Sequence, residues 1–108
     1  MIHVGGHVVH GALVDHRTRC AHYHGALDVV ALRFHCCGVW YPCVHCHDEV
    51  AGHDRTAWPA SDAEIEAALC GVCGTSMTIR AYRDAETCPA CGAGFNPGCA
   101  LHHHLYFD

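Results

Sequence analysis

Twelve cysteine and histidine residues are spaced along this 108-residue chain in pairs that suit metal chelation. The pairs are Cys20/His22, Cys36/Cys37, Cys43/Cys46, His47/His53, Cys70/Cys73 and Cys88/Cys91. Twelve ligands divide into three sites of four, and four cysteine or histidine ligands make the closed tetrahedral coordination of structural zinc. The spacing therefore predicts a protein built around three zinc ions.

A chain of this length buries only a thin hydrophobic core, so metal is expected to supply much of its stability. A structural zinc ion contributes about 10 kcal/mol or more of folding free energy, because the unfolded chain holds no preformed site. We therefore expect the metal-free chain to be largely disordered.

The ten cysteines would also suit a secreted disulfide scaffold. However, the first eleven residues lack the basic region of a signal peptide, and no run of about 18 apolar residues suggests a membrane span. Nine of the cysteines also lie beside another cysteine or a histidine at chelating spacing, which disulfide pairing does not require. We expect a reducing, cytoplasmic location and no membrane association.

The charge of the chain argues against nucleic-acid binding. Six arginines and no lysine leave a net charge of −5, and nine thiolates on three zinc ions would make it more negative. This field repels a phosphate backbone. The sequence also has no paired carboxylates, nucleophile elbow or phosphate loop, so we expect no enzyme activity.

The predicted fold class is small, metal-stabilised α+β, with short β-hairpins and short helices around the zinc sites. Composition changes near Trp58-Pro59, which predicts three parts. Residues 1–13 would be an N-terminal extension or edge strand, and residues 14–57 would hold two zinc sites. Residues 58–108 would form a short helix and a four-cysteine, zinc-ribbon-like half that packs with the first half as one unit.

A β-hairpin is predicted in the first half. Asp28–Phe34 is rich in β-branched and aromatic residues and reads as a strand. Gly38 permits a tight turn, and Val39–Tyr41 would be the returning strand. Pro42 would end the pairing, because proline has no N–H to donate.

Two short helices are also predicted. Ser61–Glu64 has the pattern of a capping box, which opens a helix through Leu69, with Ile65 and Leu69 on the buried face. Asp48–Ala51 would form one helical turn that carries His53 back toward the metal.

The remaining segments read as extended. In residues 1–13 the Gly5-Gly6 pair disfavours a helix. Thr75–Tyr82 alternates between apolar and polar residues, which predicts a strand with Met77 and Ile79 facing inward.

The two later cysteine pairs, in Cys70–Gly74 and Cys88–Gly92, are typical zinc knuckles. A two-residue gap lets one tight turn present both sulfurs to one ion, and the following glycine accepts a positive φ. The fourteen residues between the knuckles are slightly fewer than the usual 15 to 20 or so. The alternative is a redox-active dithiol pair.

The first eight ligands can be divided in more than one way. One partition puts Cys20, His22, Cys43 and Cys46 on one ion and Cys36, Cys37, His47 and His53 on another. The two sites would then interleave along the sequence, so neither could fold alone. The alternative is that Cys36 and Cys37 bind different ions, because neighbouring side chains of a strand point apart.

The other histidines and the last cysteine have less specific roles. His24, His35 and His45 lie next to ligands and are either hydrogen-bonded to them or ordinary surface residues. His102–His104 are more consistent with a surface run than with a fourth site. Cys99 is either a small buried residue or a free thiol.

Three segments together with the two knuckles resemble the CHY-type zinc finger family. These segments are Thr18–Tyr23, Asp28–Cys37 and Tyr41–His47. The likeness extends over about Val14 to Phe107, and the resemblance implies three zinc ions bound through the twelve residues named first.

Two branches of that family imply different roles. In the ubiquitin-ligase branch the finger precedes a second cysteine-rich module and a RING domain, which this sequence lacks, so ligase activity is not carried over. The run Phe95–Cys99 with Leu105–Phe107 resembles small stand-alone members. That branch implies a helper of small Tim chaperone assembly in the mitochondrial intermembrane space, which acts by handling zinc.

Two functions follow as hypotheses. The first is a non-enzymatic zinc-binding protein whose closed zinc sites hold a surface for a protein partner. Its candidate contact residues are aromatic, with core packing as the alternative for each: Trp40, Tyr41, Trp58, Tyr106 and Phe107. The second is a zinc or thiol-redox handling factor that assists other cysteine-rich proteins, suggested by the thiol density and the spare Cys99.

Overall fold

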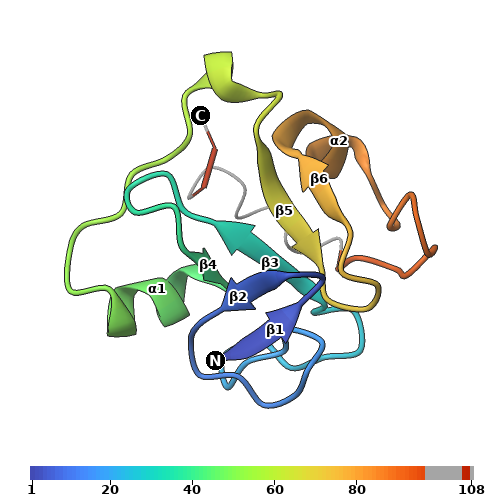
Figure 1. Ribbon diagram of the computed structural model, residues 1–108, viewed down its shortest axis with the longest axis horizontal. Helices are drawn as coiled ribbons and strands as arrows, with labels where there is room; N and C mark the ends of the chain where they lie inside the picture. The colour runs from blue at the N-terminus through green and yellow to red at the C-terminus, as the bar shows by residue number, and fades with distance from the viewer. Residues whose placement is uncertain (97–105, 108) are drawn as a thin grey trace.

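A six-stranded sheet runs through the computed structural model, which describes residues 1–96, 106 and 107 (Figure 1). The strand order is β1-β2-β4-β3-β5-β6. The strands are β1 (Ile2–Val4), β2 (His7–Val9), β3 (Val30–Arg33), β4 (Trp40–Tyr41), β5 (Glu66–Cys70) and β6 (Ser76–Thr78). The helices are α1 (Val44–Val50) and α2 (Ile79–Asp84), with a 3-10 turn at Ala60–Asp62. The fold class is therefore small α+β, as predicted.

Strand β3 lies in the middle of the sheet and pairs antiparallel with β4 on one side and β5 on the other. The predicted hairpin is confirmed, because Leu32 pairs with Tyr41 and Arg33 with Trp40. Strand β5 comes from the second half of the chain, so both halves contribute to one sheet. The division near residue 58 stays a prediction.

The N-terminal segment is extended, as predicted, and forms the hairpin β1–β2 (Figure 1). Gly5 and Gly6 make its turn with φ angles of 54° and 83°, a region open to glycine but costly for other residues. Strand β2 joins the sheet parallel to β4 through the pair Val9 and Trp40. The hairpin thus forms one edge of the sheet.

The helix predicted from Ser61 to Leu69 is wrong. After the 3-10 turn the chain forms β5, and Ala67 to Cys70 are completely buried between β3 and β6. Two strand partners outweigh the helix propensity of the alanines and leucine in this segment. Leu69 is buried as predicted, but the Ile65 side chain is exposed.

The strand predicted at Thr75–Tyr82 is correct only at its beginning. Strand β6 ends at Thr78, whose hydroxyl accepts a hydrogen bond from the Ala81 N–H and caps helix α2. Met77 and Ile79 are both buried, as expected.

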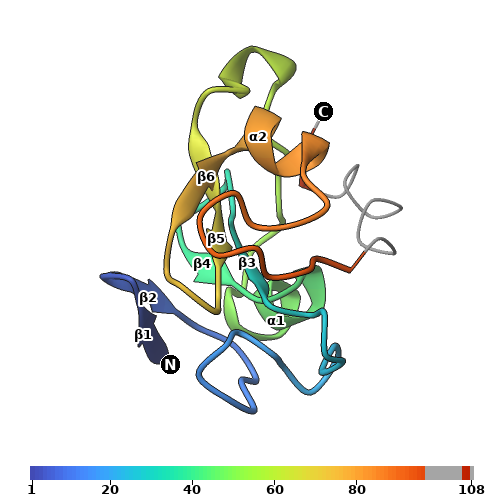
Figure 2. The same cartoon turned by 90° about the vertical axis from the view of Figure 1, so that its right-hand side faces the viewer.

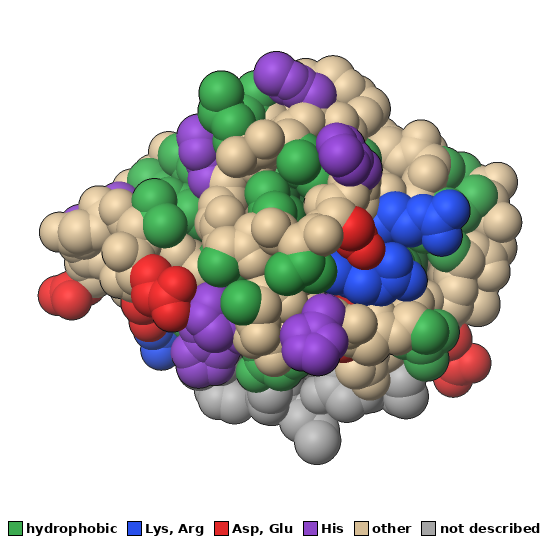
Figure 3. Space-filling model, turned by 90° about the horizontal axis from the view of Figure 1, so that it is seen from below, with side chains coloured by type: hydrophobic (Ala, Val, Ile, Leu, Met, Phe, Trp, Pro, Cys, Tyr) green, Lys and Arg blue, Asp and Glu red, His purple; other side chains and the backbone are tan. Residues whose placement is uncertain are grey.

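The core occupies both faces of the sheet, because neighbouring residues of a strand point to opposite sides. Trp40 and Leu69 belong to a small cluster that the N-terminal hairpin also joins. Tyr41 and Ala68 belong to a larger cluster on the other face, where α1 and α2 pack. When the molecule is turned by a quarter, helix α2 lies near the top and the N-terminal hairpin at the lower left (Figure 2). Several histidine side chains lie on the face seen from below (Figure 3).

The aromatic residues proposed as partner contacts lie mostly in the core. Trp40, Tyr41, Tyr106 and Phe107 are buried, and Trp58 is half-buried with its indole N–H donating to the Arg33 carbonyl at 2.8 Å. Core packing is therefore their structural role. No helix among the described residues is long and apolar enough to cross a membrane.

Candidate metal centres

The structure gathers the twelve cysteine and histidine side chains into three groups of four. Within each group the four candidate ligand atoms lie within 4.8 Å of one another. Cluster 1 is Cys20, His22, Cys43 and Cys46; cluster 2 is Cys36, Cys37, His47 and His53; cluster 3 is Cys70, Cys73, Cys88 and Cys91. Among the described residues these are the groups able to hold a metal ion, and they match the partition predicted from spacing.

Cluster 1 is built at the start of helix α1. Cys43 is the N-cap residue, and its sulfur accepts a hydrogen bond from the Cys46 N–H at 3.4 Å. Cys20 lies in a turn closed by its own N–H and the Tyr23 carbonyl, and all three cysteines are buried. Helix α1 begins at Val44, four residues before the helical turn predicted at Asp48–Ala51. The earlier start arises because the segment that carries Cys43 and Cys46 itself forms the first turn of the helix.

Cluster 2 joins three separate parts of the chain. Cys36 and Cys37 lie in the turn between β3 and β4, and both contribute to this cluster rather than to different ones. His47 comes from α1, is completely buried, and stacks on the Phe34 ring with a centroid distance of 4.4 Å. His53 returns from the loop after α1. Since α1 serves both clusters 1 and 2, the two sites interleave in space as well as in sequence.

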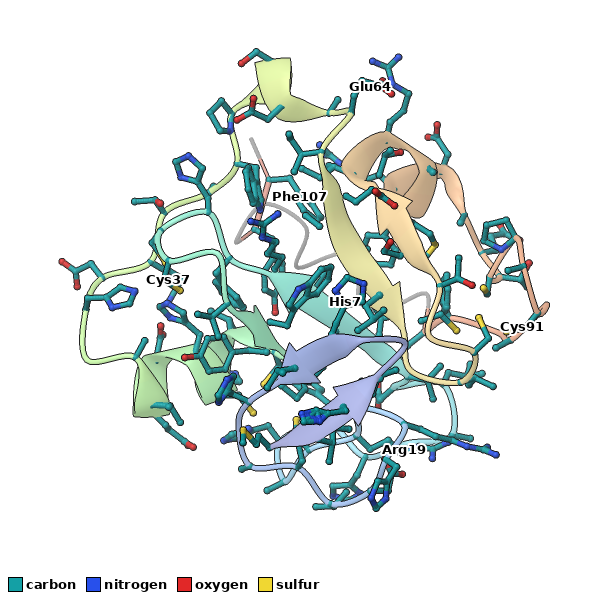
Figure 4. The ribbon with its side chains drawn as sticks, viewed as in Figure 1. His7, Arg19, Cys37, Glu64, Cys91 and Phe107 are labelled. Carbon is teal, nitrogen blue, oxygen red and sulfur yellow. The ribbon has the colours of Figure 1, made fainter. Side chains whose placement is uncertain are left out.

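Cluster 3 is formed by two knuckles that lie far from cluster 2. Cys70 ends β5, and the Gly74 N–H donates to its carbonyl at 2.8 Å; the Gly92 N–H does the same for Cys88 at 2.9 Å. Figure 4 shows Cys37 of cluster 2 and Cys91 of cluster 3 on opposite sides of the molecule. The sheet thus separates the two sites.

The distances within the clusters fit tetrahedral zinc. Zinc bond lengths imply edges of about 3.8 Å between two sulfurs, about 3.5 Å between sulfur and nitrogen, and about 3.3 Å between two nitrogens. The sulfur pairs Cys20/Cys43 and Cys73/Cys88 are 3.7 Å apart, and Cys36/Cys37 and Cys70/Cys91 are 3.8 Å apart. A disulfide needs about 2.05 Å. All nine cysteines among the described residues are free thiols.

The nitrogen distances agree with the same geometry. His22 Nδ1 lies 3.5 Å from the sulfurs of both Cys43 and Cys46. In cluster 2 the Nε2 atoms of His47 and His53 are 3.3 Å apart, and His47 Nε2 is 3.1 Å from the Cys36 sulfur. Each imidazole therefore presents one defined nitrogen to the centre of its cluster.

The other nitrogen of each histidine has an oxygen acceptor. Glu49 Oε1 lies 2.7 Å from His22 Nε2, Asp48 Oδ1 lies 2.9 Å from His47 Nδ1, and the Ala51 carbonyl lies 3.1 Å from His53 Nδ1. Since a carboxylate or carbonyl oxygen only accepts, the imidazole nitrogen facing it carries the proton. The nitrogen facing the cluster then has a free lone pair, as a metal ligand requires.

The electrostatics of the thiols also call for a cation. In cluster 1 the hydrogen bond with Cys20 raises the pKa of Cys46 to about 11. In cluster 3 burial raises the pKa of Cys70 to about 12, whereas the hydroxyl of Thr75 lowers the pKa of Cys73 to about 6. Such crowded thiols ionise together only when a positive ion balances them. A divalent metal ion meets this requirement.

Asp48 and Glu49 were not identified as site residues from the sequence. The run of acidic residues directly after His47 is the one signal that could have indicated them. His35 instead binds the Thr56 hydroxyl at 2.7 Å, and His45 packs against the rings of His22 and Tyr23. The predicted roles of Cys99 and His102–His104 concern positions outside the described residues.

Three four-membered cysteine and histidine clusters on a small sheet define a zinc-finger protein. The chain belongs to the CHY zinc finger family, whose family model matches residues 20–100. The donor sets and the family together are consistent with three zinc ions per chain.

The chain is similar to named fungal proteins over most of its length. It is 46% identical over 99 residues to Helper of Tim protein 13 of Kluyveromyces lactis, covering 92% of this chain and 87% of that protein. It is 43% identical over 104 residues to Helper of Tim protein 13 of Saccharomyces cerevisiae, covering 93% and 90%. An uncharacterized protein of Schizosaccharomyces pombe is 43% identical over 100 residues, covering 93% and 88%. No solved structure gives a significant match.

Proposed function

We propose that the twelve clustered side chains are the ligands of three structural zinc ions. The observation that carries this proposal is the tetrahedral spacing of the donor atoms, together with an acceptor for the second nitrogen of every histidine in the clusters. Each bound ion would have four protein ligands and no position left for water. Hydrolytic zinc chemistry, which needs such a position, is therefore disfavoured.

Metal analysis tests this assignment. Protein purified without a histidine tag should contain three zinc ions per chain by elemental mass spectrometry. X-ray absorption should show nine sulfur and three nitrogen donors shared among the three ions, and no bound water. A stoichiometry of two or less, or an oxygen donor at any ion, would contradict the proposal.

We propose further that the zinc-stabilised fold acts as a non-enzymatic module that assists another protein through direct contact. Two of the relatives carry the name Helper of Tim protein 13, which supports a helper role for this chain. The absence of an open zinc position in the proposed sites supports a non-catalytic role. Crosslinking in the native host should then capture one reproducible protein partner, and the metal-free chain should lose it.

The second candidate function is zinc or thiol-redox handling in the assembly of cysteine-rich proteins. The exposure of Cys37, Cys73 and Cys91 favours it, because a chelator or an oxidant can reach these thiols. Zinc release rates separate the two candidates. Purely structural sites should keep zinc for hours in a moderate chelator, whereas a handling site should release it within minutes.

We propose a cytoplasmic location for this chain. Free thiols need a reducing environment or bound metal, and we keep the prediction of a cytoplasmic protein on this ground. The Tim proteins in the relatives' names support the alternative of a mitochondrial location. Fractionation of the native host with an antibody to the chain distinguishes the two.

A further inference from the structure

Cluster 2 differs from the other two in how its outermost ligand is held. Two of its side chains, Cys37 and His53, are exposed, whereas the three cysteines of cluster 1 are buried. Cluster 3 also has two exposed side chains, but both are thiols on knuckles that backbone hydrogen bonds close. Cluster 2 is the one in which an exposed ligand is an imidazole.

His53 lies in a loop with little backbone support. Among the described residues, none of the backbone groups from Gly52 to Ala57 hydrogen-bonds to another backbone group. Gly52 begins the loop with a φ of 72°. Beside it lies a shallow hollow lined by Asp48, Gly52, His53, Asp54 and Arg55. Solvent and small chelators can therefore approach His53 directly.

Side-chain contacts keep this loop in place. Arg55 Nη1 binds Asp48 Oδ2, while the other oxygen of the same carboxylate accepts from His47 Nδ1 at 2.9 Å. Asp48 thus connects the buried histidine of cluster 2 to the loop that carries the exposed one. The Thr56 hydroxyl adds a contact with His35 at 2.7 Å.

A neutral imidazole also leaves a cation more easily than a thiolate does. Removing a thiolate separates opposite charges, and this costs far more than removing a neutral ligand in a partly buried site. Cluster 2 has two such imidazoles, but His47 is buried against Phe34 and held by Asp48. His53 is the ligand with the fewest constraints.

We propose that His53 is the replaceable ligand of cluster 2, and that the Asp48–Arg55 ion pair controls its departure. Cluster 2 is then the site where this chain exchanges metal with a thiol-bearing acceptor. A thiol of the acceptor would lose its proton to the freed His53 imidazole or to solvent, and the resulting thiolate would bind the metal in place of that imidazole. The oxidation state of the metal does not change. This inference rests on the ligand assignment proposed above.

The three different donor sets allow the order of release to be measured in one sample. Cluster 1 has three sulfurs and one nitrogen, cluster 2 has two of each, and cluster 3 has four sulfurs. Cadmium-113 shifts depend on the number of sulfur donors, so the full-length chain loaded with cadmium-113 should give three separate resonances. On stepwise addition of EDTA, the resonance of cluster 2 should disappear first. Earlier loss from cluster 1 or cluster 3, or simultaneous loss from all three, would overturn the inference.

Substitution of Arg55 tests the control of release. Arg55→Gln should speed metal loss from cluster 2 by roughly ten- to a hundredfold, the effect typical of a lost outer contact at a metal site. Clusters 1 and 3 should keep their rates. Asp48→Asn should have at least as large an effect, since it also weakens the contact with His47.

Arg80→Gln is the matched control. Arg80 pairs with Glu64 at 2.6 Å on the surface, and neither residue contacts a cluster. It should leave all three rates unchanged. If Arg55→Gln behaves like Arg80→Gln, the ion pair does not control release. If the unsubstituted chain shows fewer than three cadmium resonances, the ligand assignment itself fails, which is a different result.

Discussion

Gly5 and Gly74 lie in backbone contact, because a Cβ on Gly5 would come within 2.1 Å of the Gly74 carbonyl oxygen. Gly5 is in the turn of the N-terminal hairpin, and Gly74 follows the first knuckle of cluster 3. The hairpin thus touches the turn that carries Cys70 and Cys73 of cluster 3, about seventy residues away in the sequence. Substitutions in the hairpin turn therefore test how much this contact contributes to the free energy of unfolding.

Gly5→Ala should destabilise the zinc-loaded protein more than Gly6→Ala. Both positions have positive φ, so each alanine costs about 1 kcal/mol in backbone strain. Gly5→Ala also forces the two backbones apart, which adds about 1–3 kcal/mol, whereas nothing lies within 4 Å of a Cβ on Gly6. Denaturant unfolding at a fixed free zinc concentration measures the difference. Equal effects would mean that the contact adjusts freely.

Tyr106→Phe should destabilise the start of helix α1. The Tyr106 hydroxyl accepts a hydrogen bond from the buried Val44 N–H at 2.8 Å. Loss of this acceptor should cost about 1–3 kcal/mol, because the N–H stays buried without a partner. Denaturant unfolding of the zinc-loaded protein measures this loss. The control is Tyr41→Phe, because the Tyr41 ring is also buried, and this variant should lose less stability. The prediction fails if both variants unfold alike.

Glu49→Gln should weaken metal binding at cluster 1. Glu49 Oε1 is the acceptor for His22 Nε2, and an amide in its place is a weaker acceptor for the imidazole proton. Because Glu49 is more than half exposed, we expect the low end of the usual range, roughly a tenfold loss of affinity. A chelator titration of the cadmium-loaded protein, monitored through the cadmium-113 resonance of each cluster, measures this loss of affinity. Glu64→Gln, far from the clusters, should have no effect; loss spread evenly over all clusters would contradict the prediction.

Cys46→Ser should remove two metal ions, whereas Cys88→Ser should remove one. Cys46 belongs to cluster 1, but helix α1 also carries His47 of cluster 2, so loss of the first site should disorder the second. Cys88 belongs to cluster 3, whose knuckles lie outside α1. Elemental analysis gives the metal count, and circular dichroism gives the loss of structure. Two ions retained by the Cys46→Ser chain would show that clusters 1 and 2 form independently.

Metal-ligand spacing was the most informative part of the sequence. A knuckle must place two sulfurs on one ion over a few residues, so local geometry predicts the pairs Cys70/Cys73 and Cys88/Cys91, and their near-ribbon spacing predicts that they share one site. For the first eight side chains the sequence left two partitions open, and the structure selects the one that keeps Cys36 and Cys37 in the same cluster. Strand β3 was also predictable, because Val30 and the flanking Val29 and Phe34 are residue types that favour strands.

The segments that were predicted wrongly depend on distant partners. Glu66–Cys70 has good helix formers, yet β3 and β6 on either side make it a strand. The roles of Asp48 and Glu49 depend on where α1 begins and how it is rotated. That start is set by Cys43 as both N-cap residue and member of cluster 1, a double role that spacing alone does not reveal.

The pairing of β3 with β5 has a practical consequence for anyone who divides this chain. Two peptides cut near residue 58 would each carry one of these strands with an unpaired edge, and each edge is the complement of the other. Mixed with zinc, the fragments should reconstitute the native fold. Attached to the two parts of a split reporter, they would turn zinc availability into a signal.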